Sequence, residues 1–226
     1  TLIDMDRVKV HNLSRSPIFI AADCVDETKH PEGGVHKVAA AKRFLNDIGM
    51  TDVVSDPAAL HQSAYWRERE TGTPDIVVSA ANEYDVRYHI EMGYPPVQIY
   101  ATTGKNWQIS LLRHLPGDDA CSMCVFPPDR SKIPMACATD QTTLAESGEQ
   151  IDAALPFLSF GAGLMTAADI TKLTLPGYPF SRPRVSLNLR TAPVVTTTPI
   201  PHRKGCGCEH RDEMVHMQMI TGSRYA

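Results

Sequence analysis

Runs of apolar residues separated by polar turns divide the chain into strand-like and helix-like segments. Residues 2–10 open as a strand and continue as a loop, and the consecutive apolar residues within 75–81 indicate a buried strand. Apolar residues recur at helical spacing over 34–48, and Gly49 follows where a C-cap glycine is expected. The order of these segments, strand then helix then strand, predicts an α/β domain.

The rest of the chain continues this alternation and then becomes less regular. Helices are predicted over 61–70 and 82–92, and a hairpin or bent strand pair over 97–102 and 107–113. Later segments are predicted as a long loop (126–150), one helix or two broken helices rich in small residues (151–173), a strand (181–190) and a Thr/Pro linker (194–203). The small residues of 151–173 also suit close packing in a dimer.

Composition narrows the class of protein. With 42% hydrophobic and 21% charged residues, the 226-residue chain has the composition of a soluble globular protein that buries a sizeable core. A formal charge of -4 and the absence of a basic stripe argue against nucleic acid as a partner. No apolar run reaches the ~20 residues of a membrane span, and the acid-flanked start does not resemble a signal peptide.

Two acids follow the first apolar run. Asp4 and Asp6 come directly after Leu2 and Ile3, where a buried parallel strand ends, and nucleotides bind at that edge of doubly wound domains. Asn12 and Arg15 follow on a short loop, and an arginine there suits phosphate. On this pattern alone, a strand end with solvated charges remains the alternative interpretation.

Four cysteines form the strongest local signal. Cys121 and Cys124 are spaced as C-x-x-C, and Cys206 and Cys208 as C-x-C, so four thiolates are available for a tetrahedral structural zinc ion. Such a clip joins distant parts of the chain and favours a reducing cytoplasm over a disulfide framework. Free thiols, a disulfide, or replacement of one sulfur by His202 or His210 are the alternatives. Cys24 has no such context and is interpreted as structural.

Taken together, these patterns resemble the ThiF/MoeB/HesA family, the bacterial relatives of ubiquitin-activating enzymes. The resemblance covers most of the chain, and the motifs that carry it are, in order, Asp4-x-Asp6-x-Val8, Asn12-Leu13-x-Arg15, Gly34-Val35-His36-Lys37, the segments 76–87 and 104–126, and Cys206-Gly-Cys208. It implies a Rossmann-like fold with a mainly parallel sheet, a C-terminal antiparallel part and a structural zinc clip.

The resemblance also implies site residues and cofactors. ATP and Mg²⁺ would be bound by Asp4, Asp6, Asn12, Arg15, Lys37 and Asn82, with Asp4 on the ribose and with Arg15 and Lys37 acting catalytically on the phosphates. Asn82 stands where the family has an aspartate, and amide oxygen carries no charge for Mg²⁺. Cys137, alone in the 126–150 segment, matches a loop cysteine that receives the activated acyl group in several members; a buried packing residue is the alternative.

The resemblance further predicts two parts. Residues 1–115 would form the nucleotide-binding part without its first βα unit, and residues 116–226 the zinc-containing, carrier-binding part with a crossover loop at 126–150. No G-x-G-x-x-G phosphate loop occurs in the sequence. Residues 1–226 alone are therefore expected to adenylate poorly, with a preceding segment or a partner protomer supplying that loop.

The implied function is ATP-dependent adenylation of the C-terminal glycine of a ubiquitin-like or sulfur-carrier protein, with transfer to a thiol. The implied assembly is a homodimer or a heteromer. The alternative is a non-catalytic ThiF-like partner subunit, and ATP–pyrophosphate exchange distinguishes the two. A dehydrogenase on a similar sheet is a weaker alternative, because it leaves the four cysteines unexplained.

Overall fold

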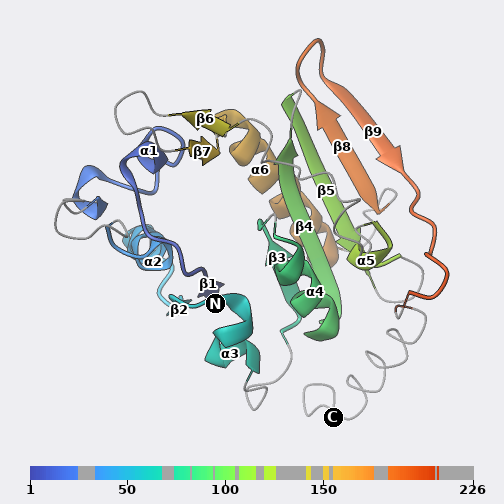
Figure 1. Ribbon diagram of the computed structural model, residues 1–226, viewed down its shortest axis with the longest axis horizontal. Coiled ribbons are helices and arrows are strands. Elements are labelled where there is room, and N and C mark those ends of the chain that lie inside the picture. The colour runs from blue at the N-terminus through green and yellow to red at the C-terminus, as the bar shows by residue number, and fades with distance from the viewer. Residues whose placement is uncertain are drawn as a thin grey trace. The chain divides into compact units, whose positions relative to one another are not determined.

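Two units divide the chain, unit 1 (Thr1–Thr71) and unit 2 (Gly72–Ala226), in the computed structural model shown in Figure 1. The structure describes residues 1–24, 34–67, 74–81, 83–93, 95–104, 107–115, 120–125, 141–143, 150–152, 155–175, 183–206 and 208. The unit boundary is structural, and the functional division between residues 115 and 116 stays a prediction.

Unit 1 is built from a short parallel strand pair and the helix that connects its strands. Its elements are β1 (Leu2–Ile3), α1 (Val10–Leu13), η1 (Ala21–Asp23), α2 (Lys37–Asp47), β2 (Ser55–Asp56), η2 (Leu60–Gln62) and α3 (Ala64–Arg67). Leu2 lies opposite Ser55 and Ile3 opposite Asp56 in parallel register. Parallel strands need a crossover, and α2 lies within it, as the alternating pattern predicts.

The first strand, Leu2–Ile3, ends where the apolar run ends, as predicted. It ends at Ile3 because the Asp4 carboxylate accepts a hydrogen bond from the backbone N–H of Asp6 at 2.7 Å, which turns the chain. The helix predicted over 34–48 is confirmed as α2, although it begins only at Lys37. Gly49 ends this segment with a φ of +93°, a conformation that favours glycine, as expected.

An ion pair between buried Asp23 and partly exposed Arg43 joins η1 to α2. The carboxylate of Asp23 is bound by both terminal nitrogens of Arg43, with Nη2 at 2.8 Å from Oδ2, and it also accepts the backbone N–H of Ile20 at 2.8 Å. The hydrogen bonds from Arg43 lower the pKa of Asp23. Spacing in the sequence gives no sign of this pair, because its members lie in different elements.

A five-stranded mixed sheet is the centre of unit 2. Its strands run in the order β3 (Ile76–Ser79), β4 (Val97–Gly104), β5 (Gln108–His114), β8 (Arg184–Asn188) and β9 (Val194–Thr198). Only the β3–β4 pair is parallel, and the other three pairs are antiparallel. The predicted α/β class is confirmed, but the prediction of a mainly parallel sheet does not hold for the described residues, because the strands after β4 all pair in antiparallel register.

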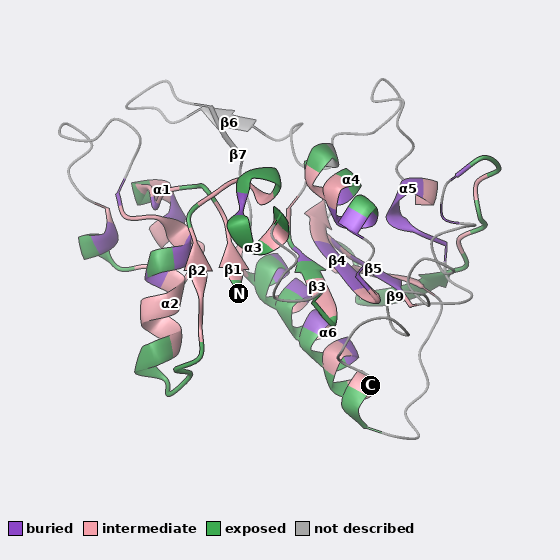
Figure 2. Ribbon diagram, turned by 90° about the horizontal axis from the view of Figure 1, so that it is seen from below, coloured by how far each residue is buried: buried purple, intermediate pink, exposed green. Residues whose placement is uncertain are grey.

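Helices cover both faces of this sheet. Figures 1 and 2 show α4 (Tyr84–Gly93) on one face and α6 (Pro156–Thr174) on the other. The remaining elements of the unit are α5 (Ser122–Val125) and the antiparallel pair β6 (Gln141–Thr143) and β7 (Gln150–Asp152). The segment predicted as a loop over 126–150 therefore contains a strand, β6. In the segment 151–173, predicted as one helix or two broken helices, residues 151–152 complete β7, and the single helix α6 follows from Pro156.

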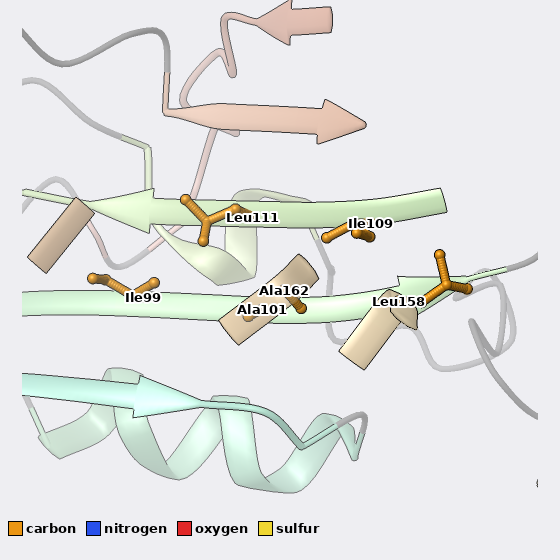
Figure 3. Packing of buried hydrophobic residues seen from close by; sticks show 6 residues of the cluster. All are labelled: Ile99, Ala101, Ile109, Leu111, Leu158 and Ala162. Carbon is orange, nitrogen blue, oxygen red and sulfur yellow. The ribbon is translucent and has the colours of Figure 1, made fainter. Parts of the chain in front are cut away.

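The hydrophobic core lies between the sheet and α6. Figure 3 shows its buried side chains, which come from β4, β5 and α6: Ile99, Ala101, Ile109, Leu111, Leu158 and Ala162. Gly161 lies so close to the sheet that a Cβ there would overlap the side chain of Ile109. A larger residue at this position would force the side chain of Ile109 to shift, so Gly161 suits the close packing of α6 on β5.

The edge strand β9 corrects a prediction. Residues 194–203 were expected to form a linker because they are rich in Thr and Pro, but 194–198 pair with β8 in antiparallel register. Five consecutive β-branched residues favour a strand, and the prolines begin only after it. All five residues are exposed, as suits an edge. None of the helices in the described part of the chain is long and apolar enough to cross a membrane.

Candidate functional site

A backbone clamp in unit 1 brings the two acids to the start of α2. The backbone N–H of Val8 donates to the carbonyl of Val35 at 2.8 Å, and Gly34 donates back to Val8 at 2.9 Å. The N–H of Lys37 donates to the carbonyl of Asp6 at 2.9 Å. The guanidinium of Arg7 adds a 2.8 Å bond to the carbonyl of Gly34. Two segments far apart in the sequence are thus held side by side by main-chain hydrogen bonds.

This clamp creates what we call the lysine turn, formed by Asp4, Asp6 and Lys37. The ammonium of Lys37 lies 2.6 Å from Oδ2 of Asp6, and the Asp4 carboxylate accepts the N–H of Asp6. The side chain of Asp6 is 56% exposed and that of Lys37 24% exposed. An ion pair this exposed contributes only ~0–1 kcal/mol to stability, so both charges can exchange partners at little cost.

Two other predicted residues lie in the same unit but have different surroundings. Asn12 is buried, and its amide oxygen accepts the N–H of Lys9 at 2.9 Å, which caps the start of α1. The backbone N–H of Arg15 donates to the carbonyl of Asn12 at 3.2 Å. The observed role of Asn12 is therefore to shape the loop that carries Arg15, and nucleotide binding by both residues stays a prediction.

The predicted magnesium ligand and the predicted acyl acceptor are not tested by the structure. Asn82 and Cys137 lie outside the described residues. The neighbouring α4 begins at Tyr84, two residues after Asn82, and the helix predicted over 82–92 is confirmed in this form. Both assignments stay predictions.

The four paired cysteines of unit 2 converge, as predicted, into what we call the cysteine cluster. The sulfurs of Cys121 and Cys206 are 3.5 Å apart, those of Cys124 and Cys208 3.5 Å, and those of Cys121 and Cys124 3.9 Å. All four sulfurs lie within 4.8 Å of one another. Sulfurs at ~2.3 Å from one tetrahedral zinc ion would be ~3.8 Å apart, so the donor set fits zinc.

Residues around the cluster hold its sulfurs in place. The backbone N–H of Arg203 donates to the sulfur of Cys124 at 3.2 Å, and its guanidinium Nε donates to the carbonyl of Met123 at 3.3 Å. The Nδ1 atom of His202 lies 3.5 Å from the sulfur of Cys208. His202 is therefore a neighbour of one sulfur among four converging sulfurs, and His210 lies outside the described residues.

Ionisation of the cluster is opposed by burial. Burial, and then the charge of Glu91, raise the pKa of Cys121, while burial and the neighbouring thiols raise the pKa of Cys208 to about 12. At Cys206 burial acts in the same direction, but hydrogen bonds from the Cys208 backbone and from the other thiols lower the pKa. A divalent cation would offset the charge of buried thiolates, so the chemistry of the donors also fits a metal.

The residues that surround the cysteine cluster were not predicted from the sequence. Glu91 and Arg203 are single charged residues in segments interpreted as a helix and a linker, and nothing in their spacing points to the cysteines. Glu91 lies at a buried position of α4, only 3% exposed, where an apolar residue would be expected. An acid at a core position of a helix is the one signal that was available.

A sequence model of the ThiF family matches residues 1–208 of the chain. The chain belongs to the ThiF family. This confirms the family resemblance, and with it the mixed α/β ThiF fold, whose four-cysteine cluster is consistent with a zinc site. No curated protein sequence matches this ThiF chain significantly.

Solved structures agree with this fold. The ThiF chain superposes on PaaA with a TM-score of 0.58 at 19% identity, covering 88% of this chain and 64% of PaaA. It superposes on Escherichia coli MccB, crystallised with AMPCPP and MccA, with a TM-score of 0.60 at 15% identity, covering 91% of this chain and 57% of MccB. The chain thus spans about three-fifths of the length of these proteins, and likeness at this identity shows the fold alone.

Proposed function

We propose that this ThiF chain forms part of an ATP-dependent adenylyltransferase that activates the C-terminal glycine of a ubiquitin-like or sulfur-carrier protein. The observation that carries the proposal is the lysine turn. Its exposed Lys37–Asp6 ion pair, at 2.6 Å, offers a cation at the start of α2 whose present partner is weakly bound. Family membership supplies the reaction class, and the turn supplies residues suited to it.

In this proposal the residues of the turn bind and orient the nucleotide. Asp4 would accept a ribose hydroxyl, while Lys37 would leave Asp6 and, with Arg15, offset the charge of the phosphates. Such fixed charges lower the barrier by stabilising charge that develops as the carboxylate attacks the α-phosphate and pyrophosphate leaves. Mg²⁺ would offset further phosphate charge, with Asn82 as the predicted contact. Cys137 would accept the acyl group in a later transfer.

The chemistry of adenylation defines the substrate that we propose. The bond formed joins a carboxylate oxygen to phosphorus, so the substrate must present a free C-terminal carboxylate. MccB was crystallised with MccA and AMPCPP, an ATP analogue, which supports a polypeptide and a nucleotide as the two substrates of this fold. We propose a structural role for zinc in the cysteine cluster, where four sulfurs leave no open position for catalysis.

ATP–pyrophosphate exchange tests the proposal. The full-length protein, together with any partner protomer that supplies the phosphate loop, is assayed with small carrier proteins that end in Gly-Gly. Exchange is expected to fall about a hundredfold in Lys37→Ala, as for other removed electrostatic donors, and to stay near the wild-type rate in Lys42→Ala, which changes a second lysine of α2. Equal exchange by both variants would refute the role of Lys37.

A second candidate function is a non-catalytic partner subunit. Asn82, in place of the family's aspartate, favours it, because an amide is a weaker ligand for Mg²⁺ than a carboxylate. In that case the protein would show no exchange by itself or with the Gly-Gly protein. It would instead raise the exchange rate of a second ThiF-family protein on mixing, which is the observation that would favour this candidate.

A further inference from the structure

A buried carboxylate connects the cysteine cluster to the helix α4. Glu91, near the end of α4, accepts the backbone N–H of Ser122 at 3.0 Å and its hydroxyl at 2.9 Å on the same oxygen, Oε1. Ser122 is fully buried and lies between the two ligands Cys121 and Cys124, as the first residue of α5. The loop that carries half of the cluster is thus bound to α4 by two hydrogen bonds from one residue.

The carboxylate also faces the sheet. The hydroxyl of Tyr100, on β4, lies 3.4 Å from Oε1 of Glu91 and 2.6 Å from Oε1 of Gln98. A hydroxyl has one proton, and the shorter distance shows that Tyr100 donates it to Gln98. Among the described hydrogen bonds, the two that Ser122 donates are therefore the shortest to Oε1. They join the segment that carries Cys121 and Cys124 to α4.

Burial makes this connection stiff. Glu91 is 3% exposed, and a carboxylate so far from water is stable only while donors surround it. If residues 121–124 moved, the carboxylate would lose the two hydrogen bonds that Ser122 donates, and the packing of α4 against this segment would loosen. Cys121 and Cys124 lie on either side of Ser122 in the chain. A metal bound to both sulfurs would therefore also hold Ser122 against Glu91.

We propose that Glu91 is a positioning residue that couples metal binding in the cysteine cluster to the packing of α4. At its other end α4 begins with Tyr84, two residues after Asn82, which is predicted to contact Mg²⁺. Metal loss would therefore loosen the packing of α4 in unit 2. This inference rests on the metal binding proposed for the cluster.

Zinc release and amide hydrogen exchange test the coupling in the zinc-loaded protein. Glu91→Met keeps the volume and removes the acceptor, so zinc transfer to a chromogenic chelator is expected to be at least tenfold faster. Glu91→Gln keeps an acceptor oxygen and is expected to stay within a few-fold of wild type. Asp169→Asn, which changes another buried carboxylate of unit 2, is the matched control and should leave zinc release unchanged.

Amide hydrogen exchange measures how zinc binding affects the stability of α4. Removing zinc from the wild-type protein is expected to speed exchange of the α4 amides, whereas in Glu91→Met these amides exchange fast already with zinc bound. If Glu91→Met does not fold, Ser122→Ala removes one of the two hydrogen bonds and should speed zinc release several-fold. Wild-type zinc release in Glu91→Met and Ser122→Ala, or exchange of the α4 amides that does not change on zinc removal, would overturn the coupling alone. A protein that binds no zinc would overturn the metal site as well.

Discussion

The lysine turn and the cysteine cluster use opposite strategies to hold reactive side chains. In the turn, main-chain hydrogen bonds fix the positions while the charged groups stay accessible, with Asp6 56% exposed. In the cluster three of the four cysteines are buried, with Cys121 2% exposed, and the Glu91 carboxylate of α4 holds the segment between Cys121 and Cys124 through Ser122. The comparison teaches that groups expected to exchange partners are held by their backbone, and groups expected to hold the fold are enclosed.

The largest effect is expected at the cluster. A Cys121→Ser/Cys124→Ser double variant removes two of four ligands, so unit 2 should lose its zinc and melt at a markedly lower temperature. Structural zinc binding is worth on the order of 10 kcal/mol in small metal-dependent domains, although a core such as that in Figure 3 adds stability of its own. Metal analysis and calorimetry measure both outcomes. Full zinc content and unchanged melting would contradict the assignment.

A buried ion pair of unit 2 gives the next effect. Asp169 on α6 accepts Nη1 of Arg113 at 2.7 Å, and both side chains are almost fully buried. Asp169→Asn removes the charge opposite a buried guanidinium, so the free energy of unfolding should fall by about 3 kcal/mol. Urea denaturation followed by fluorescence provides the measurement. A change below 1 kcal/mol would show that water reaches Arg113.

The Asp23–Arg43 pair predicts a pH dependence for unit 1. Arg43 holds the pKa of Asp23 below its usual value, so the unfolded state takes up this proton at a higher pH than the folded state. The stabilisation is present above the ordinary aspartate pKa and is lost as the pH falls through the lowered, folded value. Asp23→Asn should remove that part of the acid sensitivity and cost ~1–3 kcal/mol near neutral pH. An unchanged acid transition in the variant would contradict the prediction.

The smallest effect is expected at the lysine turn. Asp6→Asn breaks an exposed ion pair and should change the free energy of unfolding by no more than ~1 kcal/mol. The same variant frees Lys37 from its partner, so any larger effect should appear in nucleotide binding. Thermal denaturation of Asp6→Asn beside Asp169→Asn compares the exposed and buried pairs directly. A loss of stability equal to that of Asp169→Asn would end the distinction between the two regions.

The parts of this molecule that the sequence predicts best are those set by local patterns. The periodicity of 34–48 locates α2, and the alternation after residue 97 locates the β4–β5 hairpin. Paired spacing also brings the four cysteines together correctly. The family resemblance orders the motifs along the chain, and the family match over residues 1–208 confirms it.

Features that depend on distant residues could not be predicted. The strand β9 forms on the edge that β8 offers it. Glu91 is bound to Ser122, 31 residues away, and no spacing rule links them. Tertiary partners decide these cases, and a single sequence does not contain the pairing.

The central claim is that the lysine turn binds nucleotide, and a calorimetric titration with AMPCPP and Mg²⁺ tests it most directly. Asp4→Ala removes the proposed ribose acceptor and should weaken binding about tenfold or more, as for a lost hydrogen bond to a charged group. Asp52→Ala, which changes an exposed acid elsewhere in unit 1, should bind as the wild type does. Equal affinity of wild type and Asp4→Ala, or no binding by the wild-type protein, would contradict the claim.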